Sequence, residues 1–154
     1  MSDNQGMTLT VLGKPLAQPR PRFWKGRVIS TASKSHQLWK GAVTREAQQA
    51  AKMFAKETWW QSGALEVRIY YSFPTKDRRK WGEPKVTKPD VDNLNKLTYD
   101  ALEAGGLLPG GDQRIATERS AKVWAEHGRV IIEIRPLART QHHSLRARGS
   151  YWDY

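Results

Sequence analysis

Hydrophobic and polar positions alternate along residues 7–13 and 64–73, and this alternation predicts two β-strands. The second of them is expected in the middle of a sheet. Residues 128–137 predict another strand, and residues 113–126 are a candidate for a fourth.

Apolar positions at three- and four-residue spacing predict two helices. The first extends from Ser35 to about Lys56, with Ser33 or Ser35 as its N-cap. Its apolar positions are Leu38, Ala42, Val43, Ala47, Ala50, Ala51 and Phe54. The second covers residues 91–105 and ends at the glycine pair that begins with Gly105. Its expected buried stripe is Val91, Leu94, Leu97, Thr98, Ala101 and Leu102.

Two connecting segments are rich in proline and basic residues. Residues 14–23 carry three prolines, which forbid a helix and leave an extended arm; a turn at Lys25-Gly26 and a short returning strand follow. Residues 74–89 show no periodicity and are predicted to be an exposed loop that a ligand would order.

The order of these elements predicts the fold class. Strands and helices mix without a regular βαβ rhythm, and the sequence contains no internal repeat and no linker. We therefore expect an α+β fold: a single compact domain over residues 1–137, with a mixed β-sheet and two main helices. Residues 138–154 would form a basic, aromatic tail.

The charge balance points to a polyanionic partner. Lysine and arginine number 26 against 15 acidic residues, which gives a net charge of +11 and a pI near 10.1. Nucleic acid is the commonest polyanion, and a surface that is merely basic is the alternative. A membrane surface is disfavoured because no amphipathic helix has a basic polar face.

Other classes of protein are excluded by composition. The chain has no cysteine, which rules out disulfides, thiolate metal sites and cysteine nucleophiles. It has no run of about 18 apolar residues and no signal or transit peptide, so we expect a cytoplasmic protein without membrane association.

Two aspartates stand two residues apart at the start of the second predicted helix. Residues i and i+2 of an extended segment point to the same side, so Asp90 and Asp92 would aim their repelling charges at one place. A divalent cation such as Mg²⁺ removes this repulsion and can generate the attacking hydroxide in phosphodiester hydrolysis. Lys96 lies one helical turn past Asp92, beside Asn93 and Asp100, where it could contact the scissile phosphate.

A simpler interpretation of the same residues stays open. Asp90 or Asp92 could cap the helix, which stabilises it by about 1 kcal/mol, and Asp92 could form a surface ion pair with Lys96. The basic loop directly before these residues and the basic arm favour the nuclease interpretation.

The segment KPDVDNLNKLTYDALEAGGLLPGGDQRI, residues 88–115, resembles the RusA family of Holliday-junction resolvases. Family members share a D-x-D-N-x-x-K helix start, then D-A-L, then a turn with further acid and Gln. The early GKPLAQPRPRF is similar to the Pro/Arg-rich segment that follows the family's first strand.

The resemblance implies a RusA-like fold and an activity. It implies a homodimeric, Mg²⁺-dependent endonuclease, with Mn²⁺ as a substitute, that resolves four-way DNA junctions by paired symmetrical nicks in a phage, prophage or bacterial setting. It also implies that Asp90 and Asp92 are metal ligands, that Lys96 is a catalytic lysine and that Asn93 is a positioning residue.

The third carboxylate of the family departs from the pattern. The family has two adjacent aspartates, one variable residue, Gln and an apolar residue, whereas this chain has GGDQRI at residues 110–115. If Gln113 matches the family's Gln, the metal-binding aspartate falls on Gly111. If Ile115 matches the apolar residue, Asp112 becomes the third metal ligand and catalytic acid. We favour the second match because it keeps a ligand; the first would predict a non-catalytic branched-DNA-binding protein on the same fold.

Basic residues of the arm and the loop are the candidate contacts to DNA phosphates. They are Lys14, Arg20, Arg22, Arg78, Arg79, Lys80 and Lys88, with Lys76 and Lys85 in the same cluster. Trp81 could stack on opened bases, although packing on its own loop is the favoured interpretation. Trp39 and Trp124 are expected in the core or at a dimer interface.

Overall fold

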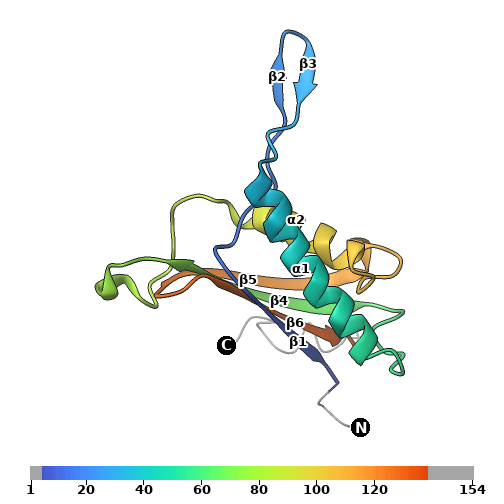
Figure 1. Cartoon of the computed structure of the whole chain (residues 1–154). Coiled ribbons are helices and arrows are strands. Elements are labelled where there is room, and N and C mark those ends of the chain that lie inside the picture. Colours follow the sequence, from blue (N-terminus) through green and yellow to red (C-terminus); the bar gives the residue numbers. More distant parts are fainter. Residues whose placement is uncertain (1–4, 139–154) are drawn as a thin grey trace, which may run out of the picture.

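The computed structural model describes residues 5–138 and contains one main sheet, one small hairpin and two helices (Figure 1). The elements in chain order are β1 (Met7–Leu12), β2 (Arg22–Trp24), β3 (Arg27–Ile29), α1 (Lys34–Met53), β4 (Leu65–Pro74), the 3₁₀ turn η1 (Arg78–Lys80), α2 (Val91–Ala104), the 3₁₀ turn η2 (Asp112–Arg114), β5 (Ile115–Ala125) and β6 (Arg129–Pro136).

The main sheet is mixed, and both helices cover one of its faces (Figure 1). Its strand order is β1-β6-β4-β5; the β4–β5 pair is parallel and the other two pairs are antiparallel. The prediction of an α+β fold with a mixed sheet and two helices is confirmed, and β4 is an inner strand as expected. The predicted tail lies, from residue 139 on, outside the described residues.

The core lies between the sheet and the helices. β4 buries every second side chain, as its alternation predicts: Leu65, Val67, Ile69, Tyr71 and Phe73. Alternate residues of β1 and β6 join them, and each large side chain buried in this way contributes about 1.5–3 kcal/mol.

Helix α1 packs the predicted apolar stripe against the core, with Leu38 as the exception. Its buried positions are Trp39, Val43 and Ala47, which follow one another at four-residue spacing, whereas Leu38 is 62% exposed. The large Trp39 ring takes the inward position next to Leu38, so the expected place of Leu38 in the stripe is wrong. Ser33 is the N-cap, and it forms a capping box with His36.

Helices α1 and α2 meet closely at a glycine. A Cβ atom on Gly105 would lie 2.5 Å from the Ala47 Cβ and 2.8 Å from the Thr44 carbonyl oxygen. Only a residue without a side chain fits there, so the glycine that ends α2 also sets the distance between the helices.

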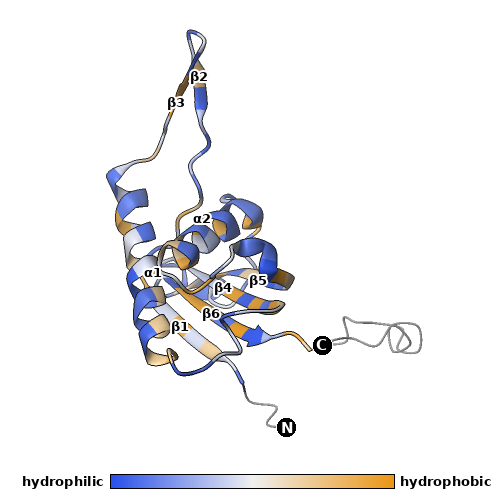
Figure 2. Cartoon of the chain, turned by 90° about the vertical axis from the view of Figure 1, so that its right-hand side faces the viewer, coloured by the Kyte–Doolittle hydropathy of each residue, from blue (hydrophilic) through white to orange (hydrophobic). Residues whose placement is uncertain are grey.

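The arm after β1 carries a two-stranded hairpin that stands away from the body of the protein in both views (Figures 1 and 2). Its turn residues Lys25 and Gly26 have φ values of 47° and 73°, and two such residues match the twist of a tight hairpin. The predicted turn and returning strand are confirmed. At the base of the hairpin, the Thr31 hydroxyl donates to the Arg20 carbonyl oxygen at 2.7 Å.

The loop between β4 and α2 is more closely packed than expected. Pro84 forms a bridge with Val123 of β5, and Lys85 is buried, so the prediction of an exposed loop is wrong for this part. Trp81 donates its indole N–H to the Thr75 carbonyl oxygen at 3.0 Å, which confirms that it packs on its own loop. Over the residues described, no helix combines the length and the apolar character needed to cross a membrane.

Candidate active site

Polar side chains of β5 face the helix layer, where the neighbouring strands present apolar ones. Glu118, Ser120, Lys122 and Trp124 pair in register with the buried odd-numbered residues of β4, so they point toward α2 and the loop before it. The first three each hydrogen-bond to that helix or loop. This edge strand therefore holds the start of α2 in position.

Two lysines hold the loop that leads into α2. Lys122 Nζ donates to the carbonyl oxygens of Thr87 at 2.9 Å and Pro89 at 2.7 Å. Lys85 Nζ donates to the Thr87 carbonyl oxygen at 3.2 Å and also to that of Lys88. The carbonyls that precede the helix are thus fixed by side-chain ammonium groups.

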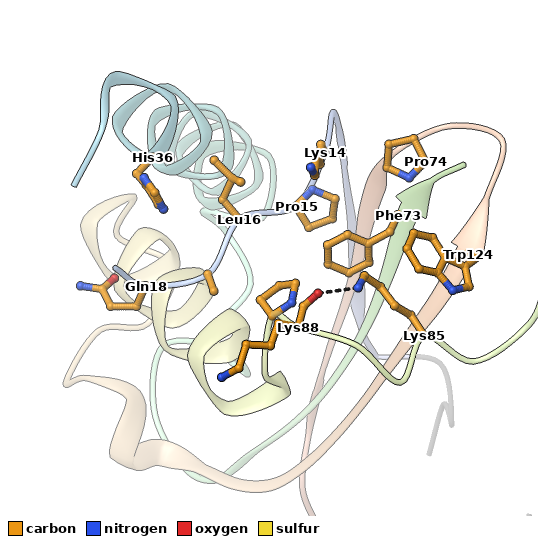
Figure 3. A pocket seen from close by; sticks show the side chains of 12 residues that line it. Lys14, Pro15, Leu16, Gln18, His36, Phe73, Pro74, Lys85, Lys88 and Trp124 are labelled. Carbon is orange, nitrogen blue, oxygen red and sulfur yellow. Dashed lines mark hydrogen bonds between the residues drawn. The ribbon is translucent and has the colours of Figure 1, made fainter. Parts of the chain in front are cut away.

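Lys85 is held inside the protein and does not face solvent as its basic neighbours do. Its ammonium lies 5.2 Å from the centre of the Phe73 ring and 4.5 Å from that of Trp124. It lines a pocket of about 390 Å³ beside the start of α2 (Figure 3). Burial, and then the nearby charges of Lys122 and Lys14, lowers the pKa of Lys85 below its ordinary value.

Asp90 occupies the N-cap position of α2 without acting as a side-chain cap. Its backbone is extended, with φ −73° and ψ 146°, and its carboxylate makes no capping hydrogen bond. Instead, Oδ2 accepts from Arg20 Nη2 at 3.1 Å and from Lys88 Nζ at 3.4 Å. The carboxylate is therefore balanced by cations, and the capping role that the simpler interpretation gave it is not formed.

Arg20 connects the arm to the first turn of α2. When the Asn93 amide is oriented with its oxygen toward the guanidinium, that oxygen accepts from Arg20 Nε at 3.2 Å and Nη2 at 3.0 Å. The Gln18 backbone N–H also donates to the Asn93 carbonyl oxygen at 2.9 Å. The sequence predicted Arg20 to contact DNA phosphate. In the structure its guanidinium hydrogen-bonds to Asp90 and Asn93.

Asp92 and Lys96 lie exposed on the first turns of α2. Within the described part of the chain they form no ion pair with each other, so the surface pair of the simpler interpretation is absent. The positive end of the helix dipole stabilises the carboxylate of Asp92 at this position.

A partly buried polar network lies beneath the same helix, and sequence reasoning missed it. Its members are Tyr71, Asn95, Thr98, Tyr99, Glu118 and Ser120. The Asn95 Oδ1 atom accepts from the Tyr71 and Ser120 hydroxyls, each at 3.0 Å, and its Nδ2 donates to Glu118 at 3.5 Å. Because Asn95 directly precedes Lys96, the network fixes the rotation of α2 and hence the directions of its exposed charges.

The tyrosine hydroxyls of this network stay protonated. Burial raises the pKa of Tyr71 well above its usual range. Burial, the hydrogen bond that Tyr99 donates to Glu118 and the negative charge of Glu118 raise the pKa of Tyr99. The charge of Asp112 adds the smallest of the effects that raise the pKa of Tyr99.

The turn before β5 presents Asp112, for which no ion pair or side-chain hydrogen bond is formed among residues 5–138. Asp112 is exposed and is the first residue of η2. Gly110 and Gly111 precede it with φ values of 89° and 98°, a region that favours glycine. A Cβ at Gly111 would lie 2.3 Å from Oε1 of the exposed Gln113 side chain, which could move aside, so the backbone angle is what requires glycine here.

Arg114 anchors this turn to the loop before β4. Its guanidinium donates to the carbonyl oxygens of Pro109 at 2.7 Å, Trp60 at 2.9 Å and Gly63 at 3.0 Å. The residue that replaces the family's Gln under the favoured match therefore has a structural role.

Asp90 and Asp92 stand together at the start of α2, whereas Asp112 lies on the separate turn before β5. Among residues 5–138, no group of three or more His, Cys, Asp or Glu side chains is placed to hold a metal ion. The structure therefore does not gather the three aspartates into one cluster.

Some of the other predicted DNA contacts are simply exposed, and others already contact a neighbouring side chain. Lys14, Arg22 and Lys80 are exposed. Arg79 is paired with Asp77 through two hydrogen bonds of 3.0 and 3.1 Å, and Arg78 lies 5.5 Å from the centre of the Trp81 ring. The basic loop therefore carries both engaged and free cations.

Comparison with known proteins identifies a family for this chain. The family model described as Endodeoxyribonuclease RusA matches residues 13–135, which include the arm, both helices and the candidate site. No curated protein matches the chain.

Proposed function

The chain belongs to the RusA endodeoxyribonuclease family, and from this premise we propose that it is a Mg²⁺-dependent, homodimeric nuclease that resolves four-way DNA junctions. The observation that carries the proposal is the first turn of α2. It presents two carboxylates, Asp90 and Asp92. The Asp90 side chain makes no capping hydrogen bond and is instead paired with Arg20 and Lys88. A two-fold dimer would place one such site on each of two strands, as paired symmetrical nicks require.

The residues at the start of α2 fit Mg²⁺ by the chemistry of their donors. Asp90 and Asp92 offer hard carboxylate oxygens, and the cations on Asp90 hold a position that a divalent ion could take. Bound there, the ion would supply an activated water and neutralise charge that develops on the phosphate. Lys96, exposed one turn along, would approach the phosphate oxygens, and Arg20, which contacts both Asn93 and Asp90, would orient the Asp90 carboxylate.

The first test is the cleavage of a mobile four-way junction with Mg²⁺ and with EDTA. Wild-type protein should produce symmetrical nicks that EDTA abolishes. Asp92→Asn should slow nicking by at least about 100-fold, because several kcal/mol of charge stabilisation is lost. Junction binding should be unchanged or tighter, since a repulsive charge is removed.

Glu103→Gln is the matched control, because it removes one negative charge from the exposed C-terminal half of the same helix. It should cleave at the wild-type rate. Cleavage by Asp92→Asn at a similar rate would show that the metal assignment is wrong.

Asp112→Asn tests the third ligand separately. If Asp112 joins the pair when DNA and metal bind, this variant should lose about 10-fold or more in nicking rate while binding junctions normally. An unchanged rate would remove Asp112 from the site. Tight wild-type binding without nicks under any divalent ion would support the alternative, a non-catalytic branched-DNA-binding protein.

A further inference from the structure

The β2–β3 hairpin sorts its side chains onto two faces. The register pairs Phe23 with Val28, which lie on one face because directly opposed residues share a side. It pairs Trp24 with Arg27, and Arg22 with Ile29, on the other. One face is thus apolar, and the other sets an aromatic ring beside guanidinium groups.

The apolar side chains of the hairpin are left uncovered by the rest of the chain. Phe23 is 80% exposed, Trp24 64% and Val28 63%. Colouring by hydropathy shows apolar segments on the hairpin, well away from the sheet and helices (Figure 2). A lone two-stranded hairpin is only marginally stable in water, and clustered exposed apolar side chains mark a binding surface.

The charge around the hairpin favours nucleic acid as the occupant. Residues 14–45 contain no aspartate or glutamate, and they contain the basic residues Lys14, Arg20, Arg22, Lys25, Arg27, Lys34, Lys40 and Arg45. Two such arms placed side by side would repel each other, whereas DNA phosphates would attract them. An exposed aromatic ring beside arginines, as Trp24 is on its face of the hairpin, is a combination that stacks on unpaired bases.

We propose that the β2–β3 hairpin enters the open centre of branched DNA, where Trp24 and Phe23 stack on bases and Arg22 and Arg27 contact phosphates. The inference rests on the proposed function, because the open form of a branch point exposes bases at its centre. The base of the hairpin supports it: Arg20 contacts Asp90, so the hairpin begins beside the candidate site and projects from there.

The experiment compares the binding of Phe23→Ala and Trp24→Ala to a four-way junction and to a duplex of the same arm sequence. Each variant should bind the junction about 10-fold more weakly, because each stacked base contributes that much or more, and should bind the duplex as wild type does. The salt dependence of junction binding should keep its slope, since no phosphate contact is lost.

The matched control is Leu38→Ala, which removes an equally exposed apolar side chain, 62% exposed, from α1. It should leave junction affinity unchanged. A junction with 2-aminopurine at its centre supplies an independent signal: wild-type binding should change its fluorescence, and Trp24→Ala should reduce that change.

Each outcome decides between the explanations. Wild-type preference for junctions with unchanged binding by both variants would overturn the hairpin inference and leave the proposed function standing. If the variants lose self-association and lose affinity for junction and duplex equally, the hairpin contacts a second copy of the chain. That result would overturn the inference. A wild-type protein that binds junctions no better than duplex would overturn both.

Discussion

Tyr99 shows how a single residue couples the fold to pH. Its hydroxyl donates to Glu118 below α2, and its pKa is raised by burial and by that carboxylate. The unfolded chain ionises tyrosine near pH ~10, so above this pH the folded state binds more protons than the unfolded state. The stability that Tyr99 contributes is therefore complete below pH ~10 and is lost as the pH rises above it.

Tyr99→Phe should reduce the rate at which the free energy of unfolding falls with pH above pH ~10. One tyrosine that ionises only on unfolding costs about 1.4 kcal/mol per pH unit, so the variant's stability should fall less steeply by about that amount. Urea unfolding at a series of pH values between neutral and strongly alkaline measures the slope. The same slope in both proteins would mean that Tyr99 ionises alike in the folded and unfolded chains.

At the scale of elements, the contact between α1 and α2 depends on Gly105. Gly105→Ala should destabilise the protein by about 2 kcal/mol or more, because its Cβ would press on Ala47 and on the backbone of Thr44. Urea unfolding measures the change in the free energy of unfolding.

Gly41→Ala is the matched control, since it makes the same substitution within α1 where a Cβ would meet only Arg45 Nη1, at 3.5 Å. It should stabilise the protein by about 0.5–1 kcal/mol, because alanine is the better helix former. Equal effects of the two substitutions would contradict the close approach.

The elements themselves could be predicted from sequence because local patterns determine them. Alternation located β1 and β4, and Gly105 marked the end of α2. One position of α1 could not be predicted, because Leu38 and Trp39 are both apolar and only the neighbouring sheet decides which one is buried.

The candidate site was predictable only where its residues lie close in sequence. Asp90, Asp92 and Lys96 fall on one helix start and follow from spacing. The contacts of Asn95 with Glu118 and of Arg20 with Asp90 join distant segments, so no local pattern reveals them. A polar Asn95 among apolar helix positions was the one available signal.

At the scale of the whole molecule, the excess positive charge is unevenly available for DNA. Arg79 is already paired with Asp77, while Lys80 forms no ion pair in the region the structure covers. Lys80→Ala should therefore reduce the slope of log affinity against log salt by about 0.9, the value for one phosphate contact.

Arg79→Ala is the matched comparison on the same loop. It should reduce that slope by less, because its charge is partly balanced before DNA arrives. Junction affinities measured over a range of salt concentrations give both values. A larger effect for Arg79 would show that it leaves Asp77 to bind phosphate.

The hydrogen bond between Thr31 and Arg20 closes the base of the hairpin, so residues 21–30 leave the body and return at one point. The hairpin can therefore be lengthened or shortened without changing the sheet or the helices. Two more residues in each strand would move its tip outward by about 7 Å. Under the proposal that the hairpin enters the branch point, its length would set how far from the carboxylates of α2 a DNA branch is held, and so where along each strand a cut would fall.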